Sequence, residues 1–143
     1  MAYFYRADVS SYTETSYPVA EAIKSVDELL TYYETYKEVY QFHIGYYSEA
    51  CMADEVFNNS ARYGDGFFES NFLLFVILEE GSGSVRHRVE SVLPEDGLLS
   101  VSITRVVPEI STADMAQWHV VLELDKALSD TDVAVVVSDE PNL

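Results

Sequence analysis

Hydrophobic side chains follow a helical spacing in the first half of the chain. They recur every three or four positions at Val26, Leu29, Leu30, Tyr33, Tyr36 and Tyr40. This spacing predicts a helix over residues 26–39. Ser25 and Glu28 have the arrangement of a helix-capping pair, which places the start of the helix at this point. A second helix is expected over residues 48–58, and residues 67–69 are expected to add one helical turn.

Extended segments dominate the second half of the chain. Residues 72–78 are apolar at every position, which is typical of a central strand covered on both faces. Residues 85–89 and 99–103 instead alternate apolar and polar side chains, and this pattern predicts an antiparallel hairpin with one buried face. The segments 118–124 and 133–137 predict two further strands, the second of them inside the sheet.

The register of this hairpin requires an irregularity. A simple four-residue loop would place Val89 opposite Ser102 and mix the buried and exposed faces. A slip of one residue moves every side chain of a strand to the other face. The sequence therefore predicts either a β-bulge or a five-residue loop in the hairpin.

Together these segments predict a single α+β domain over residues 1–143. Two N-terminal helices are expected to pack on one side of a twisted, mainly antiparallel sheet of five or more strands. Residues 1–17 are expected to form an edge strand followed by a loop, and residues 19–24 a short strand. Residues 138–143 are expected to fray.

The net charge of the chain limits which classes of partner it can bind. There are 25 acidic and 8 basic side chains, and the formal charge is −17. Such a field repels the phosphates that dominate nucleic-acid affinity and the anionic headgroups of membranes. We therefore expect neither a nucleic acid nor a membrane surface as partner. Another protein is the expected kind of partner; cationic partners or divalent cations are electrostatically permitted, but the charge alone does not demand them.

Cysteine content and apolar runs exclude several other features. Cys51 is the single cysteine, so the chain can form neither an intrachain disulfide nor a cysteine-based metal site. The chain contains no run of 18 apolar residues, so no membrane span is expected. The first residues lack a basic segment followed by an apolar run, so no signal peptide is expected. Nothing in the sequence indicates a cofactor.

Three histidines raise the possibility of a metal site or a general base. His43, His87 and His119 have none of the close spacings that metal sites use, so we predict no metal site. His87 shares the apolar face of its strand and is expected to be partly buried and hydrogen-bonded. His119 has the opposite parity to its apolar neighbours and is expected to face outward. A small hydrolase or metal-dependent enzyme built from His87, His119, Glu109 and Asp114 remains the alternative function.

Three of the few basic residues fall on the predicted hairpin. Arg86, Arg88 and Arg105 lie near His87 along the strands. Arginine binds carboxylates through two parallel hydrogen bonds, so a converging group could bind an acidic chain terminus or an anionic ligand. The alternative, which we favour, is that these arginines pair with acidic side chains of the same sheet: Glu79, Glu80, Glu90 and Glu109.

Tyrosines crowd the predicted helix and the segment after it. Part of this stripe must belong to the core, but tyrosine is also enriched at protein interfaces. If Tyr32, Tyr36 and Tyr47 stay exposed, they are candidates for binding a partner or a second copy of the chain.

The order of segments around the first long apolar strand resembles a known family. Residues 67–76, the Gly-Ser-Gly-Ser turn at 81–84 and the following strand pair are similar to the C-terminal domain of PrcB-like proteins. These are accessory subunits of a bacterial surface protease complex, and small exported bacterial proteins of unknown function share the same order. The resemblance covers residues 65–137. It implies an exported, non-catalytic domain with an extracellular or cell-surface location. Our leading hypothesis is a non-catalytic binding or accessory domain that acts through a surface patch.

Overall fold

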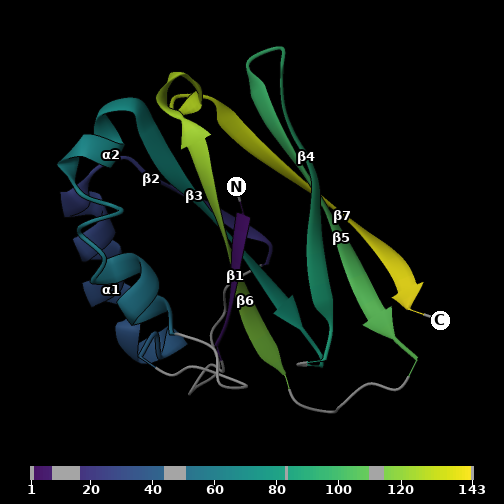
Figure 1. Cartoon of the computed structure of the whole chain (residues 1–143). Helices are drawn as coiled ribbons and strands as arrows, with labels where there is room; N and C mark the ends of the chain where they lie inside the picture. Colours follow the sequence, from purple (N-terminus) through teal and green to yellow (C-terminus); the bar gives the residue numbers. More distant parts are fainter. Residues whose placement is uncertain (1, 8–16, 44–50, 83, 110–114, 143) are drawn as a thin grey trace.

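The computed structural model describes residues 2–7, 17–43, 51–82, 84–109 and 115–142. In these residues seven strands form two sheets, and helices cover the outer face of the larger sheet (Figure 1). The predicted α+β class with mainly antiparallel pairing is confirmed. The prediction of a single sheet is wrong, because the strands divide between two stacked layers.

The larger sheet has four antiparallel strands in the order β1-β6-β3-β2. Their bounds are Ala2–Ala7 for β1, Ala116–Asp125 for β6, Asn71–Glu80 for β3 and Val19–Ile23 for β2. The predicted N-terminal edge strand and the short strand after it are both confirmed. The loop predicted within residues 1–17 falls mostly on residues 8–16, which lie outside the described residues.

The smaller sheet has three strands in the order β4-β5-β7. Strands β4 (Arg86–Glu95) and β5 (Leu98–Pro108) form the predicted hairpin. The predicted β-bulge is present: Val89 pairs with Ile103 and Ser91 with Ser102, so the register shifts between them. Asp96 and Gly97, both with positive φ, make the tight turn.

Strand β7 (Asp132–Asn142) corrects two predictions. It was expected inside the sheet, but it is an edge strand that runs parallel to β5. It was also expected to fray from residue 138, but strand pairing with β5 continues through Asn142. The chain leaves the smaller sheet to form β6 and returns through the 3-10 turn Lys126–Leu128, so β7 enters the sheet in the same direction as β5.

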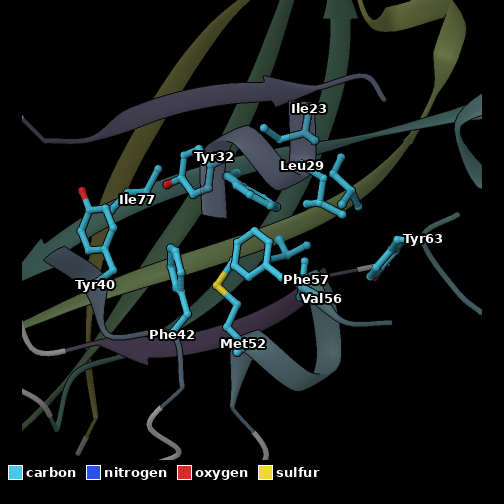
Figure 2. Close-up of a cluster of buried hydrophobic side chains, with 14 of the residues drawn as sticks. Ile23, Leu29, Tyr32, Tyr40, Phe42, Met52, Val56, Phe57, Tyr63 and Ile77 are labelled. Atoms are coloured by element: carbon cyan, nitrogen blue, oxygen red, sulfur yellow. The ribbon is translucent and has the colours of Figure 1, made fainter. Parts of the chain in front are cut away.

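Strand β3 is apolar from Phe72 to Leu78 because both of its faces are buried there. Leu73, Phe75 and Ile77 pack against the helical layer, as Figure 2 shows for Ile77. The residues between them pack against the inner face of the smaller sheet, which supplies Leu99, Val101 and Ile103. The second face of residues 72–78 is therefore covered by the smaller sheet.

Helix α1 (Val26–Tyr40) confirms the predicted helix and its cap. The Ser25 hydroxyl accepts a hydrogen bond of 3.1 Å from the Glu28 backbone N–H. This bond satisfies one of the N–H groups left free in the first turn of a helix. Leu29, Tyr32 and Tyr40 lie on the buried face of the helix (Figure 2).

The rest of the helical layer differs from the prediction. Within the predicted second helix, the described residues form a single π-helical turn, Ala53–Phe57, and residues 48–50 lie outside the described residues. The additional turn predicted near residues 67–69 is confirmed as α2 (Asp65–Ser70). Val56, Phe57 and Phe68 from these two turns are buried in the core beneath α1.

Candidate functional site

A groove runs between α1 and strand β2. Its volume is about 350 Å³. It is lined by Glu21 and Ile23 of β2 and by six residues of α1: Asp27, Glu28, Thr31, Tyr32, Thr35 and Tyr36. A second hollow shares Asp27, Thr31 and Thr35, so the depression continues across the surface of α1.

Two tyrosines form the aromatic part of the groove. Tyr32 is only 7% exposed, whereas Tyr36 is 38% exposed. Their ring centroids lie 4.7 Å apart. The Tyr32 hydroxyl lies 2.7 Å from Nε2 of His119. This contact with a buried side chain of the core fixes the position of the Tyr32 ring. The groove therefore combines one fixed aromatic ring with one partly exposed ring.

Carboxylates surround these rings. Glu21, Asp27 and Glu28 are exposed, and none of the lining residues is basic. Burial and the neighbouring charges, including that of Glu21, raise the pKa of Tyr32, so its hydroxyl stays protonated. The nearby Lys24 forms an ion pair of 3.2 Å with Asp130. The electrostatic field of the groove is therefore negative.

Strand β2 gives the groove one open side. It pairs with β3 along one edge, from Val19 opposite Ile77 to Ile23 opposite Leu73. It is the last strand of its sheet, and no described strand pairs with its other edge. Edge strands present unpaired backbone N–H and C=O groups that can pair with another chain.

The structure gives the three arginines of the predicted site different partners. Arg105 points inward and binds the carboxylate of Glu80 with Nε at 2.9 and 3.0 Å. It also donates to Asp139 at 2.6 Å. His87 Nε2 lies 2.7 Å from the same Glu80 carboxylate, and both side chains are 1% exposed. The predicted part-buried, hydrogen-bonded His87 is confirmed.

The charged side chains of this inward cluster compensate one another. Burial alone raises the pKa of Glu80, but hydrogen bonds from His87 and Arg105 outweigh it and hold the pKa below its ordinary value. The hydrogen bonds that Arg105 donates to Glu80 and Asp139 help to raise the pKa of Arg105. Glu80 therefore carries a buried negative charge that the cluster itself neutralises.

The other two arginines make different contacts. Arg88 is exposed and forms ion pairs with Glu90 and with Glu140, the latter at 2.6 Å. The Arg86 guanidinium lies 5.4 Å from the ring centroid of Trp118. Alternation along β4 sends Arg88 to the side opposite His87, whereas the Arg86 guanidinium reaches the same Trp118 ring that His87 contacts. The favoured pairing with acidic side chains of the sheet is thus observed for Arg88 and Arg105, and anion binding by the four residues remains a prediction.

The two histidines of the alternative enzyme site lie on opposite faces of the larger sheet. His119 is 1% exposed, so the prediction that it faces outward is wrong. The helical layer covers that face of β6, and burial lowers the pKa of His119 to about 3. His119 contacts Tyr32 on this face, whereas His87 contacts Trp118 on the opposite face of the sheet. Glu109 is exposed, and Asp114 lies outside the described residues.

The tyrosine prediction is only partly compatible with the structure. Tyr32 is buried and cannot provide an exposed contact, because its face of α1 packs on the sheet. Tyr36 is exposed enough to meet a partner, and Tyr47 lies outside the described residues. Sequence reasoning missed the polar part of the groove, although Asp27, Thr31 and Thr35 repeat every four residues and so share one face of the helix.

Comparisons with known proteins leave the function open. No protein-family model matches the chain, and no curated protein or solved structure is significantly similar to it. The PrcB-like resemblance and the export that it implies remain predictions. None of the described helices combines the length and apolarity needed to cross a membrane. Among the described residues, no three histidine, cysteine, aspartate or glutamate side chains are grouped so that they could hold a metal ion.

Proposed function

We propose that this protein is a non-catalytic binding domain whose contact surface is the groove between α1 and β2. The observation that carries the proposal is the juxtaposition of a groove of about 350 Å³ with an edge of β2 that none of the described strands pairs with. Grooves between a helix and a sheet edge offer both side-chain pockets and backbone hydrogen bonds to a partner.

The groove supports this role better than the arginine cluster does. Glu80, Arg105 and Asp139 already satisfy one another, so an anionic ligand would have to displace existing ion pairs. In the groove, Glu21, Asp27 and the partly exposed Tyr36 face solvent. Tyrosine is also a residue type enriched in protein interfaces. The extracytoplasmic accessory role that the sequence resemblance implies is compatible with such a surface.

A substitution that fills the groove tests this proposal. Thr35→Arg places a long cationic side chain in the groove at an exposed helical position, where the cost to folding is small. Ser138→Arg adds the same side chain at an exposed position of β7 and serves as the matched control. Each protein is immobilised and used to capture proteins from cells and culture medium of the source organism, with quantitative mass spectrometry as the readout.

We expect the native chain and Ser138→Arg to recover the same specific proteins, and Thr35→Arg to recover them at least tenfold less. Circular dichroism confirms that both variants are folded. Recovery of the same proteins by Thr35→Arg, or of no specific protein by the native chain, contradicts the proposal.

A further inference from the structure

We infer that the groove receives an extended, basic segment of another protein, which adds a strand to the free edge of β2 and places a lysine or arginine side chain between α1 and β2. This inference rests on the proposed function and specifies its ligand. Three observations support it: the edge of β2, the orientation of Glu21 and the charge of the groove.

The backbone of β2 can support such a strand. Its residues Val19–Ile23 pair with β3 on one side only among the described strands. An added strand would lie about 4.8 Å from β2 and would form backbone hydrogen bonds that do not depend on its sequence. Specificity must then come from its side chains, every second of which would face α1.

The side of β2 that faces α1 is the side that carries the groove. Glu21 pairs with Phe75 and Ile23 with Leu73, and both partners belong to the core beneath the helices. Glu21 and Ile23 therefore point toward the helical layer, and both line the groove. Alternate side chains of an added strand would enter the same space.

The charge of this space selects a cation. Glu21, Asp27 and Glu28 supply carboxylates. Glu34 lines the adjoining hollow with Asp27, but its carboxylate is already paired with Lys37 at 2.8 Å. The whole chain adds a formal charge of −17, which attracts cationic partners and raises their association rate. The partly exposed ring of Tyr36 offers a face for a cation–π contact with lysine or arginine.

The ligand chemistry is tested with a random decapeptide library displayed on phage and selected against the full chain. We expect the selected peptides to carry lysine or arginine at alternating positions, with few prolines, because proline cannot donate the backbone hydrogen bonds of a strand. One enriched peptide is synthesised with a fluorescent label, and its Kd is measured by anisotropy at two salt concentrations.

Charge-matched variants locate the binding site of that peptide. The double substitution Glu21→Gln with Asp27→Asn removes two charges from the groove, and Glu69→Gln with Glu95→Gln removes two from exposed positions outside it. We expect the first pair to raise Kd at least tenfold and the second to change it less than twofold. The affinity of the native chain should fall as salt rises.

The contrary outcomes separate the two proposals. Peptides without basic residues whose binding is abolished by Thr35→Arg would overturn the basic ligand but keep the groove as the binding surface. Basic peptides that bind both charge variants equally would place the ligand elsewhere and overturn this inference. If the library yields no peptide that Thr35→Arg or the groove charge variant weakens, the inference fails regardless of which proteins the native chain captures.

Discussion

The hydroxyl of Tyr32 lies 2.7 Å from Nε2 of His119, deep in the core between α1 and β6. This contact joins the helical layer to the centre of the larger sheet. It also fixes the Tyr32 ring, which forms part of the groove. Core packing and the proposed binding surface therefore share one side chain.

Removing the Tyr32 hydroxyl should destabilise the fold, although the substitution deletes a single oxygen atom. Tyr32→Phe leaves Nε2 of His119 buried without its partner, and an unsatisfied buried polar group costs about 1–3 kcal/mol. Tyr36→Phe, at a partly exposed position, is the control and should change stability by less than about 0.5 kcal/mol. Urea denaturation measures both. Equal stabilities for the two variants would show that the hydrogen bond contributes little.

His119 should make the fold sensitive to mild acid. Burial lowers its pKa from 6.5 to about 3. Between these two values the unfolded chain binds a proton that the folded chain does not, so stability falls as the pH falls. One pKa unit corresponds to about 1.4 kcal/mol, which gives a total loss of roughly 5 kcal/mol from this residue.

NMR measures this titration directly. The Cε1–H signal of His119 in the folded protein should not shift between pH 7.5 and pH 4.5. In His119→Phe, the free energy of unfolding should depend less on pH across the interval from 6.5 to 4.5. A His119 signal that titrates near pH 6.5 while the protein stays folded would contradict the buried, neutral assignment.

The buried carboxylate of Glu80 should also lose its stabilising effect in acid, but at a lower pH than the onset for His119, because its ordinary pKa is lower. Glu80→Gln breaks its pairing with Arg105 and His87 and should cost about 3 kcal/mol near neutral pH, the low end for a broken buried pair, because Arg105 is 28% exposed. The folded pKa of Glu80 lies below its ordinary 4.5. Its contribution is therefore complete above that value and is lost as the pH falls through the folded pKa.

The difference in stability between the native chain and Glu80→Gln should accordingly stay constant from pH 7 to about pH 5 and shrink below pH 4.5. Glu95→Gln changes an exposed carboxylate and is the control. A difference that grows on acidification would mean that Glu80 is protonated in the folded protein.

Neighbouring residues of β3 should be equally intolerant of truncation. Leu73 faces the helical layer and Leu74 faces the smaller sheet, and both are 0% exposed. Leu73→Ala and Leu74→Ala should each cost about 2–5 kcal/mol, whereas Leu93→Ala, at a side chain that is 50% exposed, should cost far less. Thermal unfolding measures all three, and a small cost at either Leu73 or Leu74 would mean that one face of the sheet is open.

Local patterns in the sequence predicted elements well and their assembly less well. The cap at Ser25 and the spacing after it located α1, because both depend on neighbouring residues. The mismatch between Val89 and Ser102 predicted either a β-bulge or a five-residue loop, and the structure has the bulge. Local patterns could not predict that the strands divide into two sheets. A strand with two buried faces shows that both are covered, but its own sequence does not show what covers them.

The same limit explains the errors at His119 and in the candidate site. Alternation correctly gave His119 the opposite face from Trp118, but the helical layer buries that face as well. The groove depends on the placement of α1 beside β2, which follows from tertiary packing. Only the four-residue repeat of Asp27, Thr31 and Thr35 could have indicated its polar wall.

Hydrogen exchange of the β2 amides in the free protein tests the central claim most directly. The binding proposals require that one edge of Val19–Ile23 is unpaired. Alternate amides of an edge strand point away from its partner, so we predict that alternate β2 amides exchange rapidly while those bonded to β3 are protected. Uniform slow exchange across all β2 amides would show that the edge is already occupied and would contradict the account.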